Sequence, residues 1–186
     1  MTEERRARVL SIVVCGAGPA GEVGRLVGPA QERGWDVQVI ATPAALDFID
    51  VADLEARTGR PVRSAYRKPG QPRSPRSDAV IVAPATYNTI NKTAVGISDT
   101  YALGILAEAP GLGIPVVMLP FVNSALAGRR AFRRSVDELR AEGVRVLFGP
   151  GEFEPHPPGT GGERIDRFPW LSALLLAEEM TTRAIV

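Results

Sequence analysis

Apolar runs alternate with amphipathic segments along most of this chain. Val9 to Cys15 is apolar except for Ser11, and Val80 to Ala83 and Val116 to Leu119 are similar short runs. Short apolar runs rich in β-branched residues are typical of strands that are buried on both faces of a parallel sheet. Between them, apolar residues recur at helical spacing, first at Val23, Leu26, Val27 and Ala30. The pattern therefore predicts strands connected by helices.

Strands that alternate with helices indicate a parallel sheet covered on both sides. We predict an α/β fold, a Rossmann-like (flavodoxin-like) three-layer sandwich with a mainly parallel sheet. The remaining predicted elements are strands at Asp36 to Ala41 and Val144 to Phe148, and helices at Asp50 to Gly59, Tyr101 to Ala109, Ala125 to Glu142 and Leu171 to Met180. The segment 149–162, which holds the single histidine His156, is predicted to be a loop.

Length and composition limit the class of protein. The 186 residues suit one domain, so we treat 1–186 as a single unit. Basic and acidic side chains number 22 and 21, so no net field favours nucleic acid or a membrane surface. The single cysteine, Cys15, excludes an intrachain disulfide and a cysteine-ligated metal site, and it suits a reducing cytoplasm. No export or anchoring signal is expected in the N-terminal segment.

Four turns fall at the carboxyl ends of the predicted strands. They are Gly16 to Gly21, Thr42, Pro84 to Thr89 and Pro120 to Ser124. Ligands of open parallel sheets bind at this edge, where helix N-termini offer free N–H groups to anions. The sequence therefore predicts one ligand site assembled from the four turns.

The first turn reads as the GxGxxG pattern of dinucleotide-binding proteins, with glycines at 16, 18 and 21. That interpretation needs an acidic residue at the end of the second strand to hold a ribose. The chain has Thr42 there, and a hydroxyl suits a phosphate better, which favours a mononucleotide. Two simpler explanations stay open: the glycines allow a tight turn, and Thr42 caps the helix that Pro43 begins.

A proline-rich loop with several basic residues runs from 64 to 77. It contains Arg67, Lys68, Arg73 and Arg76, and Arg63 directly precedes it. Prolines exclude a helix or a central strand here. The basic side chains either face water or clamp an acidic ligand, and unpaired charges in a loop usually face water.

The turn at Pro84-Ala85-Thr86-Tyr87-Asn88-Thr89 resembles the Pro-Ala-Ser-Ala-Asn-Thr signature of the flavin-dependent cysteine decarboxylases. This family includes phosphopantothenoylcysteine decarboxylase and the lantibiotic peptide decarboxylases. The match continues to Asp99 and covers the chain from Val9 to about Leu147. The resemblance implies non-covalently bound FMN, a small-molecule or peptide substrate, and a homotrimer or dodecamer whose FMN site lies between subunits.

The resemblance also implies roles for individual residues. Gly16, Gly18 and Thr42 would lie near the FMN phosphate, and Thr86 and Thr89 would lie along the flavin. The other expected cofactor-binding residues are Pro84, Ala85 and Asp99. Asn88 and Asn123 are the expected catalytic residues, since Asn123 matches the asparagine of the family motif Pro-x-Met-Asn-x-x-Met-Trp. The neighbours of Asn123 differ, because Val122, Leu126 and Ala127 replace Met, Met and Trp.

The chain departs from the family where a histidine is expected. The family's catalytic histidine lies about 14 residues before the signature proline, which here falls in the loop 64–77, and this loop has none. Arginine is too basic to replace a base that titrates near neutrality. His156, between prolines in a loop, is expected to be a surface or structural residue. The segment 155–165 loosely resembles the family's glycine-rich substrate clamp, without its cysteine.

Three functions remain open on this evidence. The first is an FMN-dependent decarboxylase, a carboxy-lyase-like enzyme acting on a cysteine-containing substrate. The second is a non-decarboxylating FMN-binding protein, a flavin oxidoreductase or a prenyl-flavin-type transferase on the same fold. The third, a dinucleotide-binding protein without flavin, rests on the glycine turn alone.

Overall fold

A five-stranded parallel sheet forms the centre of the computed structural model, which describes residues 6–183. The strands are β1 (Arg8–Val14), β2 (Trp35–Ala41), β3 (Ala79–Ala85), β4 (Val116–Pro120) and β5 (Arg145–Val146), in the order β2-β1-β3-β4-β5. All neighbouring pairs run parallel. The predicted α/β fold is confirmed.

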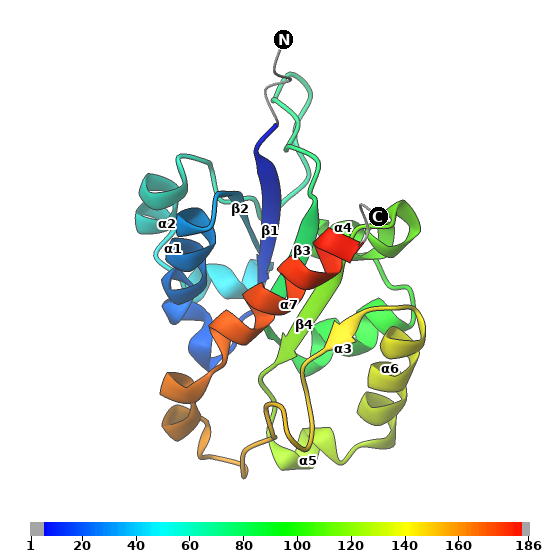
Figure 1. Cartoon of the computed structure of the whole chain (residues 1–186). Coiled ribbons are helices and arrows are strands. Elements are labelled where there is room, and N and C mark those ends of the chain that lie inside the picture. Colours follow the sequence, from blue (N-terminus) through cyan, green and yellow to red (C-terminus); the bar gives the residue numbers. More distant parts are fainter. Residues whose placement is uncertain (1–5, 184–186) are drawn as a thin grey trace.

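Helices cover both faces of this sheet (Figure 1). One face packs against α1 (Gly24–Glu32), α2 (Val51–Thr58) and α7 (Trp170–Arg183), and the other against α3 (Tyr87–Ala94), α4 (Tyr101–Glu108) and α6 (Arg130–Ala141). Alternate residues of β1 divide between the two faces: Leu10 and Ile12 lie in the first apolar cluster, and Val13 lies in the second. Within the described residues, no helix is both long and apolar enough to cross a membrane.

Short helical turns lie at the strand ends and in the connections. They are η1 (Gly18–Glu22), η2 (Pro43–Asp47), η3 (Pro110–Leu112), α5 (Ser124–Ala127) and η4 (Gly161–Arg167). The predicted helix at 50–59 is confirmed as α2: the Asp50 side chain accepts from the Asp53 N–H, and Gly59 ends the helix at positive φ.

Two predicted elements were wrong in extent. The helix predicted over 125–142 is interrupted, because Arg129 has extended backbone (φ −68°, ψ 133°) between α5 and α6. The strand predicted over 144–148 pairs with β4 only at Arg145 and Val146. Its last residue leaves the sheet, since the Phe148 N–H donates to the Glu152 carboxylate at 2.6 Å.

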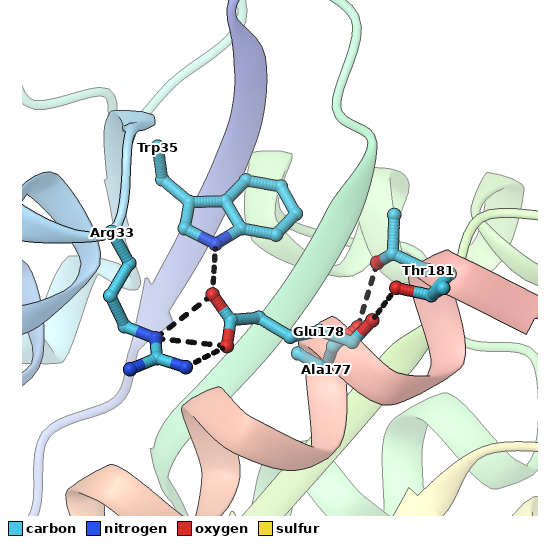
Figure 2. Close-up of polar contacts among 6 residues, drawn as sticks. Arg33, Trp35, Ala177, Glu178 and Thr181 are labelled. Atoms are coloured by element: carbon cyan, nitrogen blue, oxygen red, sulfur yellow. Dashed lines mark hydrogen bonds and ion pairs between the residues drawn. The ribbon is translucent and has the colours of Figure 1, made fainter.

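Helix α7 is tied to the sheet by one carboxylate (Figure 2). Glu178 accepts from Arg33 Nε at 2.9 and 3.0 Å and from Arg33 Nη2 at 2.7 Å. It also accepts from Trp35 Nε1 at 3.1 Å, at the start of β2. These bonds, led by the one from Arg33, hold the pKa of Glu178 below its usual range.

We predict that Glu178→Ala lowers the free energy of unfolding by about 1–3 kcal/mol, because it leaves the buried Trp35 N–H without a partner. Urea denaturation at pH 7, followed by circular dichroism, measures the loss.

Glu179→Ala is the matched control, since it removes an exposed carboxylate that pairs with Arg183 on the same helix, and its effect should stay within about 0.5 kcal/mol. The Glu178 carboxylate stabilises the fold above the unfolded pKa of about 4.3. This contribution is lost as the pH falls through the lower folded pKa. Equal losses in the two variants at pH 7 would contradict the anchoring role.

Candidate functional site

Backbone hydrogen bonds tie the carboxyl ends of the strands together. The Thr42 N–H donates to Val14 O at 2.9 Å, and the Cys15 N–H donates to Pro84 O at 3.1 Å. The Phe121 N–H in turn donates to Ala85 O at 2.9 Å. The four turns predicted to meet are therefore adjacent, and they form one edge.

Two threonines of the signature turn have structural partners. Thr86 is the N-cap of α3, where its Oγ1 accepts from the Thr89 N–H at 3.3 Å. The buried Thr89 hydroxyl lies 3.1 Å from Thr86 Oγ1 and 3.2 Å from Cys15 Sγ. Burial raises the pKa of the Cys15 thiol, which keeps it protonated at neutral pH. The Cys15 thiol is therefore inert packing in this environment.

The two asparagines of the predicted site keep polar groups at the surface. Asn88 is exposed in the first turn of α3, where Thr86 already provides the cap. Asn123 is the N-cap of α5, and its Oδ1 accepts from the Leu126 N–H at 3.0 Å. This bond uses the oxygen of Asn123, so its amide NH₂ is left to donate to a ligand.

The glycines of the first turn are positions of close approach. A Cβ on Gly16 would lie 2.8 Å from Ala44 O, in η2. A Cβ on Gly18 would lie 3.3 Å from a ring carbon of Phe121 and 3.5 Å from the end of Ile165. The simpler explanation of tight packing therefore accounts for Gly16 without any ligand.

Thr42 precedes η2, but its hydroxyl makes no capping hydrogen bond. Thr42 stands at the N-cap position, but the alternative that its side chain explains itself by capping is not supported, because the hydroxyl accepts no N–H of the 3₁₀ turn. The hydroxyl is thereby left for a ligand.

Pro84, Ala85 and Asp99 are the remaining predicted cofactor-binding residues. Pro84 and Ala85 are buried at the end of β3, so their backbone shapes the turn. Asp99 lies on the segment between α3 and α4, where Lys92 Nζ holds its carboxylate at 2.5 Å.

His156 was not expected at this edge. Its carbonyl accepts from the Ser124 N–H at 2.7 Å, and it pairs with Asn123 as a parallel bridge. The imidazole lies on Phe121, with ring centroids 4.7 Å apart. Only 7% of the residue is exposed, and Nδ1 has no hydrogen-bond partner among the described residues. Of the two roles expected for His156, surface or structural, the structural one applies, since the loop folds back onto the sheet edge.

An aromatic cluster made from distant segments holds this loop. Phe121 packs against Phe153 and Phe168, and Phe168 packs edge-on against Trp170, with centroids 4.7 to 6.3 Å apart. Sequence reasoning missed the cluster. Its members come from separate segments with no regular spacing, so one sequence carries no signal for it.

A hollow of about 650 Å³ lies at the opposite edge of the sheet, beside the amino ends of β4 and β5. Its lining includes Pro115, Val144 and Met180, and none of the predicted site residues. The carboxyl edge has the polar donors and the ligand-binding position of the fold, so we place the candidate site there.

The family model described as Flavoprotein matches residues 1–161. The chain belongs to the flavoprotein family. The resemblance seen in the sequence is thereby confirmed, and a flavin-binding function is the one expected of this family.

The chain is also similar to relatives whose names are known. The chain is 30% identical over 144 residues to the coenzyme A biosynthesis bifunctional protein CoaBC of Escherichia coli (strain K12), covering 74% of this chain and 34% of that protein. CoaBC of Mycolicibacterium smegmatis is 28% identical over 188 residues, with 96% and 41% covered. The chain therefore spans about a third to two fifths of these relatives.

Among solved structures, the FMN-dependent cysteine decarboxylase TvaF from thioviridamide biosynthesis has a TM-score of 0.71 and 25% identity. The superposition covers 94% of this chain and 98% of that one. The shared fold thus extends over nearly the whole flavoprotein chain.

The carboxyl edge fits the phosphate and ring of a flavin by its chemistry. The Thr42 hydroxyl, which caps nothing, and the Asn88 and Asn123 amides are neutral groups that an anion tolerates. Leu46 and Phe48, which follow Thr42, are 40% and 49% exposed and offer an apolar surface. A site with a few polar groups beside apolar side chains is typical of cofactor binding.

We predict that Gly16→Ala lowers the free energy of unfolding by about 1–3 kcal/mol, because the new Cβ forces the first turn away from Ala44 O. Gly28→Ala is the matched control, since the Gly28 position in α1 has open space around it. It should raise stability by about 1 kcal/mol or less. Urea denaturation compares the two; a neutral Gly16→Ala would show that the turn is loosely packed.

We also predict that His156 titrates below its usual pKa of about 6.5. Burial lowers its pKa, and the positive charge of Arg164 lowers it further. Because the chain has a single histidine, NMR titration of its imidazole C–H signals gives the value without assignment.

The unfolded chain takes up this proton first, so stability should fall as the pH drops below about 6.5. His156→Gln should show a smaller fall between neutral pH and the folded pKa. A titration at or above the usual value would mean that the imidazole is open to solvent.

Proposed function

We propose that this flavoprotein binds FMN and catalyses the decarboxylation of a substrate with a terminal cysteine-like carboxylate. The proposal rests on one observation: four turns, with Pro84 to Thr89 among them, lie side by side and are joined by backbone hydrogen bonds. The names of the relatives support it, since TvaF is an FMN-dependent cysteine decarboxylase and CoaBC acts in coenzyme A biosynthesis.

The phosphate of FMN would lie at the first two turns. The backbone N–H groups of Gly16 and Gly18 and the free Thr42 hydroxyl are the groups that would bind it. The flavin ring would lie along the signature turn, with the exposed side chains of Leu46 and Phe48 as an apolar wall.

The substrate carboxylate would lie at the two amides. Asn88 and the NH₂ group of Asn123 would donate hydrogen bonds that orient it. When bound, the flavin supplies two-electron oxidation of the substrate thiol and accepts the electrons that the product later takes back. The chain's own contribution is to position the substrate and to exclude water.

A non-decarboxylating flavoprotein, such as an oxidoreductase or a prenyl-flavin-type transferase, is the second candidate. The position of His156 favours it, because the single histidine of the chain is buried against Phe121. The loop 64–77 holds no histidine, so proton transfer from the family's histidine position would need a different base.

We also propose a homo-oligomer, a trimer or a dodecamer, in the cytoplasm. The polar donors and exposed apolar residues of the carboxyl edge lie at the surface of one chain, so a second subunit would complete the site. The protonated, buried Cys15 thiol is compatible with a reducing compartment.

An absorbance spectrum of the purified protein, followed by mass spectrometry of the released chromophore, tests the proposal. Oxidised-flavin bands and the mass of FMN are expected. CO₂ release from a cysteine-ended peptide then separates the two candidates: release supports the decarboxylase, whereas a yellow protein without release supports the second. A colourless protein that cannot be loaded with FMN would refute both.

We predict that Asn88→Asp weakens FMN or substrate binding by about 10-fold or more, because a new carboxylate repels an anionic ligand. Flavin fluorescence titration measures the loss. Gln31→Glu is the matched control: it makes the same change of amide to carboxylate on an exposed residue of α1. Unchanged flavin and ligand affinity in Asn88→Asp would remove Asn88 from the site.

A further inference from the structure

A separate hollow of about 220 Å³ lies between the loop 64–77 and α4. Its charged walls come from three arginines, and its other polar groups are hydroxyls. The lining residues are Arg63, Ala65, Tyr66, Arg67, Arg73, Ser74, Pro75, Tyr101 and Ile105. No carboxylate belongs to this lining, so the hollow is strongly basic.

The three arginines lack acidic partners. None of Arg63, Arg67 and Arg73 makes an ion pair with another described residue. Arg63 Nε is buried and has no hydrogen-bond partner among the described residues. A buried N–H of a guanidinium is costly to leave unpaired. The Arg63 Nε–H donor is therefore left without an acceptor.

The sheet fixes the backbone of Arg63, one of the residues that line the hollow. The Ala41 N–H donates to Arg63 O at 2.8 Å, and the Arg63 N–H donates to Val39 O at 3.1 Å. This short parallel pairing adds Arg63 to the edge of β2. The backbone that carries the buried guanidinium nitrogen is therefore held before any ligand arrives.

The aromatic wall is also ordered by contacts. Tyr66 packs edge-on against Tyr101 with centroids 5.3 Å apart, and Ser74 Oγ lies 3.2 Å from the Tyr101 hydroxyl. Gly104 in α4 leaves room for the Tyr66 hydroxyl, since a Cβ on Gly104 would collide with it. Two separate parts of the loop are thereby joined to α4.

We propose that this hollow binds a small ligand through a phosphate or carboxylate group. The guanidinium fork matches both oxyanions with paired N–H donors. The tyrosine hydroxyls and Ser74 would complete the hydrogen bonds, and Ile105 and Pro75 would contact the apolar part of the ligand. The site differs from the flavin turn in every residue that it uses.

Calorimetric titration of the FMN-loaded protein with inorganic phosphate, and separately with malonate, tests this site at low ionic strength. Binding of phosphate alone identifies a phosphate-bearing ligand, and binding of malonate alone identifies a carboxylate. Affinity for the preferred oxyanion should fall as salt is raised, because the arginines are partly open to water. Binding of neither oxyanion would overturn the proposal.

The double variant Arg67→Gln/Arg73→Gln should raise the Kd at least about 10-fold. The matched control is Arg130→Gln/Arg134→Gln, which removes the same charge from two exposed residues of α6. Arg63→Lys keeps the charge but removes the buried Nε donor, so it should raise the Kd about 3-fold or more. Equal affinity in both double variants would overturn the proposal.

The result is independent of the proposed function. If the protein holds no FMN but phosphate binding depends on the loop arginines, the flavin proposal fails and this one stands. If FMN binds and neither oxyanion does, the opposite follows. A change of oligomeric mass in the loop variant, with no oxyanion binding to the wild type, would assign the arginines to a subunit contact.

Discussion

The candidate site depends on backbone hydrogen bonds that join the carboxyl ends of neighbouring strands. Each strand end is bonded to the next turn: Thr42 to Val14, Cys15 to Pro84, and Phe121 to Ala85. These bonds continue the parallel ladder of the sheet by one step into the turns. Because no side chain takes part in them, the turns can present polar side chains without using those side chains to hold their own positions.

The same edge shows which parts of the structure the sequence could predict. The strands, the convergence of the four turns and the capped helix α2 follow from local patterns: apolar runs, glycines and an Asp at the N-cap. The break at Arg129 was missed, because arginine has good helix propensity. The local signal was Gly128, which ends α5 directly before Arg129.

The position of His156 was out of reach for a different reason. Its carbonyl bonds to Ser124, and its ring lies on Phe121, more than thirty residues earlier in the chain. Contacts at such separation leave no periodic signal in one sequence. Prolines around His156 correctly indicated a loop, but they do not say whether the loop faces water or folds onto the protein. The aromatic cluster decides that question.

The basic residues show the same limit of sequence-based prediction, because a charge in the sequence does not show which residues surround it. Arginines of α6 and of the loop 64–77 look alike in the sequence, and the solvated interpretation suits both. The structure separates them, because Arg67 and Arg73 of the loop line a hollow together with Arg63, whose Nε is buried. The number of charged residues in the sequence does not distinguish the two groups of arginines. The pairing of the Arg63 backbone with β2 helps to distinguish them, and this pairing joins segments that are distant in the sequence.

Residues of the signature turn therefore divide by the contacts they make inside the chain. Thr86 and Thr89 are accounted for by capping and by the Cys15 thiol, so their presence would be explained in a protein with no ligand. Asn88 is exposed at a helix start that is already capped, and Asn123 has a donor left over after capping α5. Capping accounts for the oxygen of Asn123 but not for its NH₂ group, and it accounts for no part of the Asn88 side chain. The functional argument is therefore strongest at Asn88, because there the fold makes no use of the side chain.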